Sequence, residues 1–317
     1  MYNEDLKARF IRHYTQSVST ANSAVELFNS IECIEEKYNS DYASMTIEQA
    51  TEAINATQTL RASSMEYRIA VLKSYVNWCC SSGIDGVNMD LIFIEPTNLN
   101  HIRHMMIKNP IHMHSILDKV YAPIEEKSIE NIYRFYLWMM YSGMNEEQIM
   151  SCTKDDIDYK RMEIAIGKQR FPIYRESLDV VVFCADAKEL AERHALMIDS
   201  RDVVPRYPGN ELYRTIRKIN NKDAVRTTIT GYLNRAYKSG KIDMKLTRKS
   251  IHLSGIFYRM YEREINGFPV DFTEDAINEM QGKEYKVNGR FTMNVKTKRI
   301  MRDFEEDYAN WKTAFNL

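Results

Sequence analysis

The residues with the strongest chemical bias are the lysines and arginines between Arg206 and Arg263. This segment holds 14 of them against four acids, so it carries a local net charge of +10. The rest of the chain carries −11, because the whole chain of 317 residues has a formal net charge of −1. Such a segment can neutralise the phosphates of a polyanion. A solvated surface with an acidic counterpart elsewhere explains the same asymmetry, and charge alone does not separate the two.

Four histidines form the second group with possible chemistry. His101, His104, His112 and His114 are close together in the sequence and could in principle bind a metal ion. No carboxylate or thiol lies at ligand spacing beside them, which favours mobile or half-buried histidines over a metal centre. We therefore expect no metal and no cofactor.

The cysteines and the distribution of apolar residues indicate the cellular compartment in which the protein is expected. The chain has five cysteines, an odd number without a C-x-x-C pair, which favours reduced thiols in a protein core. No apolar run approaches the roughly 18–20 residues that cross a bilayer, and the start MYNEDLKARF lacks the pattern of an export signal. The expectation is a cytoplasmic protein of a bacterial host cell that does not contact membranes.

The N-terminal third is predicted to be a small helical domain. Two helices are expected between Asn3 and Tyr38, and a third from Met45 to Ala56 with Thr46 as its N-cap. The best-defined helix is SSMEYRIAVLKSYVNWCC, for which Ser63 and Glu66 predict a capping box. Its apolar stripe has helical period and consists of Met65, Ile69, Leu72, Val76 and Cys79. Gly83 is expected to end it.

The second domain is predicted to begin after a less regular stretch that contains Pro96 and Pro110. The expected division is a helical domain over residues 1–98, a linker over 99–111 and a second domain over 112–317. An apolar helix from Ile129 ends at Gly143, and a short helix over Asn145–Ser151 follows. Alternating apolar residues on both sides of the letters GKQR then predict a β-hairpin.

This order of elements, with the stretch YSGMNEEQIMSCTKDDID, resembles the tyrosine recombinase (phage integrase) family. Ser142, Gly143 and Met144 match the T-G-L of that family's first motif, and residues 156–158 match its D-I-D strand. The resemblance implies a mainly α, two-domain tyrosine-recombinase-like fold. Its parts would be an N-terminal SAM-like helical core-binding domain and a C-terminal recombinase catalytic-like α domain with a small β-sheet.

The resemblance also locates the catalytic positions, and most of them hold other residues. Asn145 lies at the first arginine, Gln148 at the motif glutamate, and Lys168 matches the catalytic lysine. In the H-x-x-R box, Lys249 replaces the histidine and His252 the arginine. The later G-H pair falls near Gly282 and Lys283, and the nucleophilic tyrosine near Phe291 and Thr292.

These replacements predict a protein without recombinase activity. Loss of one fixed charge at a phosphoryl-transfer centre costs about 10²–10⁵ in rate, and here several charges are lost together. Asn145 cannot offer a guanidinium fork to a phosphate. Tyr285 or Tyr308 could act as nucleophile, but neither replaces the missing charge.

DNA binding does not need transition-state geometry, because each neutralised phosphate adds salt-dependent affinity through counterion release. With the resemblance, the side chains expected to contact double-stranded DNA are Arg61, Lys73, Lys168, Arg170, Arg226, Arg235, Lys245, Arg248, Lys249 and His252. For Arg61 and Lys73 alone, ordinary surface residues are the simpler explanation.

The function that the resemblance implies is a sequence-specific DNA-binding repressor that maintains phage lysogeny through operator sites in a phage genome. The alternative is an active or accessory site-specific phage integrase.

An amphipathic helix is predicted at the C-terminus, with Ile300, Phe304, Tyr308, Trp311 and Phe315 as its apolar anchors. It could serve self-association or cover its own domain equally well.

Overall fold

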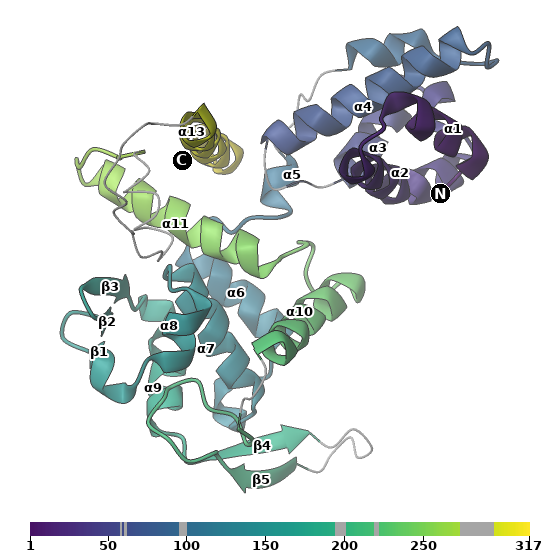
Figure 1. The fold of residues 1–317 in the computed structure, drawn as a ribbon. Coiled ribbons are helices and arrows are strands. Elements are labelled where there is room, and N and C mark those ends of the chain that lie inside the picture. The colour runs from purple at the N-terminus through teal and green to yellow at the C-terminus, as the bar shows by residue number, and fades with distance from the viewer. Residues whose placement is uncertain (58, 60–61, 95–99, 194–200, 219–221, 273–294) are drawn as a thin grey trace. The chain divides into compact units, whose positions relative to one another are not determined.

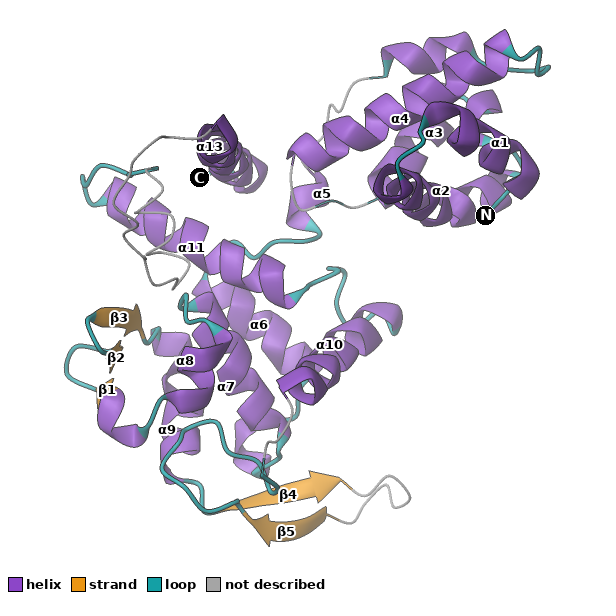
Figure 2. Ribbon diagram, in the orientation of Figure 1, coloured by secondary structure: helices purple, strands orange, loops and turns teal. Residues whose placement is uncertain are grey.

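The computed structural model describes residues 1–57, 59, 62–94, 100–193, 201–218, 222–272 and 295–317. The chain divides into two compact units, Met1–Arg103 with Ala309–Leu317 and His104–Tyr308. Helices dominate both, as Figures 1 and 2 show, and the strands described lie in the second. The prediction of a mainly α fold with a small β-sheet is confirmed. None of the helices described has the length and apolar character needed to cross a membrane.

The first unit is built on four helices and one short helix, α1 Glu4–Tyr14, α2 Val18–Tyr38, α3 Ile47–Ala56, α4 Ala62–Ser81 and α5 Asn100–Arg103. The predicted N-cap of α3 is confirmed, because the Thr46 hydroxyl accepts from the N–H of Gln49 at 3.3 Å within a capping box. The predicted stripe of α4 is buried throughout. The predicted cap at Ser63 is wrong, since this residue lies inside α4.

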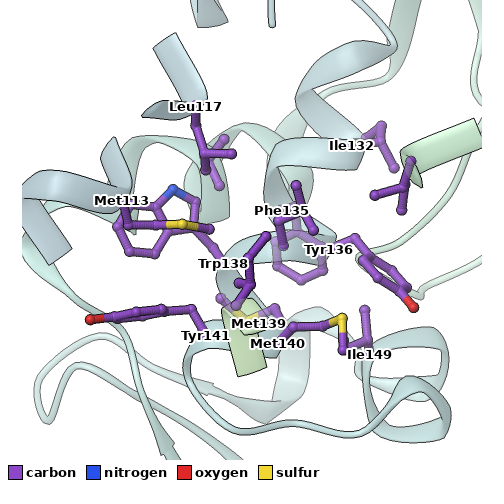
Figure 3. Close-up of a cluster of buried hydrophobic side chains, with 14 of the residues drawn as sticks. Met113, Leu117, Ile132, Phe135, Tyr136, Trp138, Met139, Met140, Tyr141 and Ile149 are labelled. Carbon is purple, nitrogen blue, oxygen red and sulfur yellow. The ribbon is translucent and has the colours of Figure 1, made fainter. Parts of the chain in front are cut away.

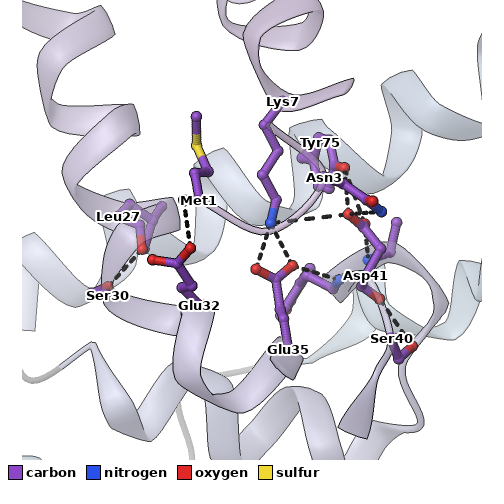
Figure 4. Close-up of polar contacts among 12 residues, drawn as sticks. Met1, Asn3, Lys7, Leu27, Ser30, Glu32, Glu35, Ser40, Asp41 and Tyr75 are labelled. Carbon is purple, nitrogen blue, oxygen red and sulfur yellow. Dashed lines mark hydrogen bonds and ion pairs between the residues drawn. The ribbon is translucent and has the colours of Figure 1, made fainter. Parts of the chain in front are cut away.

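A buried ion-pair network crosses the core of the first unit. The Lys7 ammonium donates to both carboxylate oxygens of Glu35, at 2.5 Å to Oε1, and both side chains are fully buried (Figure 4). Asp41 lies 3.9 Å from the same ammonium and accepts from the Tyr75 hydroxyl at 3.0 Å. Around this network pack the aromatic rings of α1, α2 and α4, with Phe10 at 5.2 Å from the Tyr75 ring.

The second unit is built around α7 (Glu130–Tyr141), which is buried on nearly every side. Such a helix has no solvent face, so its sequence is almost continuously apolar. The other helices are α6 Pro110–Val120, α8 Glu146–Ser151, α9 Leu178–Asp186, α10 Lys222–Lys238, α11 Arg248–Ile265 and α13 Val295–Phe315, of which the residues up to Tyr308 belong to this unit. Figure 3 shows Met113 and Leu117 of α6 and Ile149 of α8 among the side chains of α7.

Two small antiparallel sheets complete this unit. The first has the order β1 (Ile157–Asp158), β2 (Glu163–Ile166) and β3 (Gln169–Pro172). The predicted hairpin is confirmed, but its turn holds only Gly167 and Lys168, because Ile166 pairs with Gln169. The second sheet pairs β4 (Glu189–Arg193) with β5 (Arg201–Pro205) and was not predicted from the sequence.

The predicted C-terminal helix is confirmed as α13. Within the second unit its rings pack on α11, with Phe304 and Tyr308 at 5.3 and 5.6 Å from the Phe257 ring. The Tyr308 hydroxyl donates to Glu264 at 2.6 Å. This part of α13 therefore covers the chain's own α11, and self-association through it stays a prediction.

Candidate nucleic-acid interface

The turn after α7 and the first residues of α8 together span residues 142–148, and we call this segment the motif turn. Its Gly143 has a φ of 98°, a left-handed conformation that ends α7 as predicted. A Cβ at this glycine would overlap the Arg259 guanidinium. The backbone conformation therefore favours glycine, and a larger residue would displace the Arg259 side chain.

Asn145 and Gln148 form a reciprocal cap at the start of α8. The Asn145 side-chain oxygen accepts from the Gln148 backbone N–H at 3.0 Å, and the Gln148 side-chain oxygen accepts from the Asn145 N–H at 2.8 Å. Asparagine is among the best N-cap residues, whereas arginine has no acceptor to offer there. At these two positions the residues found in this chain hold the local fold together.

The motif turn is tied to the hairpin that carries Lys168. The Gln148 side-chain amide also donates to the side-chain oxygen of Gln169, the first residue of β3. Lys168 occupies the second position of the two-residue turn just before it and is exposed. Lys168 therefore directly precedes a residue, Gln169, whose side chain contacts the motif turn.

Helix α11 contributes three side chains to the motif turn from one face. His252 Nε2 donates to the Gly143 carbonyl at 3.3 Å, and Arg259 Nη1 donates to the Ser142 carbonyl at 2.7 Å. Arg248, one turn before His252, faces α8. This approach depends on Gly255, because a Cβ there would overlap the backbone carbonyl of Tyr141.

Glu146 is the centre of a charged group that also contains Tyr136, Arg226 and Arg248, which we call the Glu146 cluster. Arg226 Nε donates to the two carboxylate oxygens at 3.0 and 2.9 Å. The Tyr136 hydroxyl donates to Glu146 at 3.0 Å and accepts from Arg248 at 3.2 Å. Arg248 Nη1 lies 3.6 Å from Glu146 Oε1. Two arginines from different helices thus share one carboxylate.

The charge states within the cluster follow from these contacts. Burial acts to raise the pKa of Glu146, but hydrogen bonds from Arg226 and Tyr136 and the charges of both arginines outweigh it and lower that pKa. Burial raises the pKa of Tyr136 to about 12. At neutral pH the carboxylate is therefore ionised and the phenol protonated.

Three of the lysines predicted to contact DNA are exposed. Lys168 lies in the hairpin turn, Lys245 just before α11, and Lys249 in the first turn of α11. In the part of the chain that the structure describes, no carboxylate pairs with any of them. Their charges are therefore available to a polyanion.

Three other predicted contact residues make different contacts or lie in another unit. Arg170 donates to the carbonyls of Gly167 and Gln169 at 2.9 Å, so it folds back on its own hairpin. Arg235 lies 4.6 Å from the centre of the Tyr232 ring, about 14 Å along α10 from Arg226 at 1.5 Å per residue. Lys73 is half-buried on α4, in the first unit. Arg61 lies outside the described residues, as do Lys283 and Phe291, which were predicted as altered catalytic positions and not as DNA contacts.

Of the predicted residues, the structure brings Asn145, Arg226, Arg248 and His252 together at the motif turn. Glu146 and Arg259 also belong there, although neither was predicted from the sequence. An acid directly after a helix N-cap, as at Glu146, is a recognisable sequence signal for a helix start. The partner of Glu146, Arg226, is 80 positions away, so no local pattern indicates the ion pair.

Tyr308 is not placed for chemistry at the motif turn. Its hydroxyl is bonded to Glu264, which lies about 24 Å along α11 from Arg248 at 1.5 Å per residue. Burial and the Glu264 contact raise its pKa. Tyr285 lies outside the described residues.

Among the residues described, no group of three or more His, Cys, Asp or Glu side chains could hold a metal ion.

Comparisons with known proteins give one family match. Residues 1–81 match the family described as MrpR, N-terminal core-binding domain, so the prediction for the first helical domain agrees with this match. No curated protein sequence matches the chain. Solved structures that are similar to the chain include the following two. One is XerA recombinase, with 11% identity, coverage of 99% and 98% of the two chains, and a TM-score of 0.41. The other is the Tn1549 transposon integrase, residues 82–397 in complex with circular intermediate DNA, with 12% identity, 94% and 98% coverage and a TM-score of 0.35.

Proposed function

We propose that this protein binds duplex DNA at specific sites without cutting it, on a scaffold related to tyrosine recombinases. The N-terminal match to a core-binding domain and the motif turn of the second unit support this relationship. The match covers only residues 1–81, and the resemblance of the motif turn extends the proposal to the second unit.

The observation that carries the proposal is that the residues of the motif turn are engaged in contacts within the fold. The position of the first catalytic arginine holds the N-cap of α8, and the nearby carboxylate of Glu146 binds Arg226 and Arg248. Phosphoryl transfer needs fixed positive charge at the reacting phosphate. Here the arginines are already neutralised, and His252 is bonded to a backbone carbonyl. These contacts favour binding over catalysis.

The affinity for DNA is assigned to the exposed lysines Lys168, Lys245 and Lys249. Each can neutralise one backbone phosphate. Every such contact makes the fall of log Kobs steeper by about 0.9 per tenfold rise in salt concentration. Such contacts position a protein on DNA, whereas base contacts supply the specificity.

The biological role proposed is a transcriptional repressor that maintains phage lysogeny. The length and the altered motif resemble the master repressor of SPbeta-like phages, and the role is carried from that resemblance. A protein that holds duplex DNA without cutting it can block a promoter.

Footprinting on phage genomic DNA tests this proposal. The expected result is a small set of discrete protected sites that weaken steeply as salt rises. Uniform, sequence-independent protection would contradict a repressor. Weak binding alone combined with stable binding beside a true recombinase would favour an accessory integrase instead.

A further inference from the structure

The Glu146 cluster has the composition of an anion-binding site whose anion is part of the chain. Arg226 and Arg248 project from α10 and α11 onto the same carboxylate, and the Tyr136 hydroxyl supplies a further donor. Guanidinium groups bind carboxylates and phosphates with the same forked geometry. The donors that hold Glu146 are therefore also suited to a phosphate.

The cluster is open to solvent on one side. The arginine side chains are 42% and 27% exposed, whereas the Glu146 side chain between them is only 13% exposed. An external phosphate could approach both arginines, but it would meet the fixed negative charge of Glu146. Two like charges in one site repel each other, so one of the two anions must leave.

We propose that Glu146 is an internal counter-anion that occupies a phosphate site formed by Arg226, Arg248 and Tyr136. By holding this site, it lowers the affinity of the protein for any DNA backbone. Sequence-independent binding depends mainly on phosphate contacts, so a site held by Glu146 limits the background affinity of the protein for DNA. The inference rests on the proposed DNA-binding function and adds to it a residue that limits phosphate binding.

Neighbouring residues set the expected size of the effect. Arg226 also pairs with Asp223 at 2.7 Å, so loss of the Glu146 charge leaves it partly neutralised. In the described part of the chain, Arg248 has Glu146 as its carboxylate partner and is the charge that would be freed most completely. One to two additional phosphate contacts are therefore expected when Glu146 is neutral.

Glu147 offers a matched control. It is the next residue along the chain, is 85% exposed, and lies 3.5 Å from the Lys222 ammonium. Glu146→Gln and Glu147→Gln remove the same charge from adjacent positions, but only the first opens the arginine pair. A general effect of net charge would act on both variants equally.

The first experiment is a salt titration of binding to a random-sequence duplex. We expect Glu146→Gln to bind about tenfold more tightly than wild type at 0.1 M salt, with a salt slope steeper by about 0.9 to 1.8. Glu147→Gln should remain within about twofold of wild type. Equal behaviour of the two variants, or weaker binding by Glu146→Gln, would overturn the inference.

A second measurement does not depend on DNA. Thermal unfolding of the full chain is followed in inorganic phosphate and in sodium chloride of equal ionic strength. Phosphate should raise the Tm of Glu146→Gln above that of its chloride control, because a ligand that binds only the folded state stabilises it. Wild type and Glu147→Gln should show no such difference. If wild type binds no duplex, the proposed function fails while this test still decides the inference. An equal response of Glu146→Gln and Glu147→Gln to phosphate would refute it.

Discussion

Each unit of the chain contains an ion-pair network, and the two networks differ in their contact with water. The Lys7 and Glu35 side chains of the first unit are 0% exposed. In the Glu146 cluster of the second unit, the carboxylate is nearly covered but both arginines reach solvent. A buried pair must satisfy itself within the fold, whereas a pair open to water can exchange partners with a ligand.

This difference assigns different roles to charges of the same kind. Removing a partner from the first network leaves an uncompensated charge in the core, so the effect should appear in folding. Removing a partner from the second network frees a charge at the surface, so the effect should appear in binding. Substitutions in each unit can test this division, from the largest expected effect to the smallest.

The largest effect is expected for Lys7→Met. Breaking a buried ion pair at one partner costs about 3–5 kcal/mol of unfolding free energy. Urea denaturation of the full chain measures this loss. The matched control is Lys37→Met, because Lys37 pairs with Glu52 at 2.7 Å on the surface, where water screens the pair, and its loss should be much smaller. Equal losses in the two variants would contradict a folding role for the buried network.

The second prediction concerns pH. Burial raises the pKa of Glu35 from 4.5 to about 7 against the opposing effect of Lys7. Between these values the folded state holds the proton more tightly than the unfolded state, so stability falls as pH rises. The contribution of Glu35 falls by up to about 3 kcal/mol over this window. The unfolding free energy should therefore decline less steeply with rising pH in Glu35→Gln than in wild type. Identical pH dependence in the two proteins would refute the raised pKa of Glu35.

The third prediction concerns the motif turn. Gly143→Ala should lower the unfolding free energy by about 2–3 kcal/mol, because the left-handed backbone is strained and the Arg259 guanidinium must move. Gly167→Ala isolates the backbone contribution, since Gly167 has a φ of 58° with open space around it. It should cost about 1–2 kcal/mol, the strain of the left-handed backbone alone. A cost for Gly143→Ala no larger than this would mean that Arg259 adjusts freely.

The smallest effect on stability belongs to the exposed lysines. Lys249→Ala should change the unfolding free energy by less than about 0.5 kcal/mol. It should nevertheless weaken binding to a footprinted duplex and reduce the salt slope by about 0.9. Lys154→Ala is the control, because Lys154 is an exposed lysine paired with Asp186 at 2.6 Å. If both variants keep the wild-type slope, the DNA contacts lie elsewhere.

The local patterns of the sequence predicted much of the fold. The stripe of α4, the cap at Thr46 and the end of α7 at Gly143 each depend on residues a few positions apart, and each is confirmed. Ser63 was assigned wrongly because a capping pattern fits equally well one residue inside a helix. The strands β4 and β5 were not predicted because apolar and polar residues do not alternate regularly along them.

The candidate site was less predictable, because its contacts join distant parts of the chain. The resemblance to recombinases placed Asn145 at the position of their first catalytic arginine, but the sequence gave no sign that this residue caps α8 together with Gln148. Arg226 and Arg248 were predicted as basic surface residues. Their shared partner Glu146 follows only from the packing of α8, α10 and α11.

The central claim is that this protein holds duplex DNA without cutting it. Its most direct test is incubation with a footprinted duplex that carries a nick beside the protected site, which would trap any covalent intermediate. We predict salt-dependent retention on a native gel and no protein–DNA adduct on a denaturing gel. A covalent adduct through a tyrosine would contradict the account.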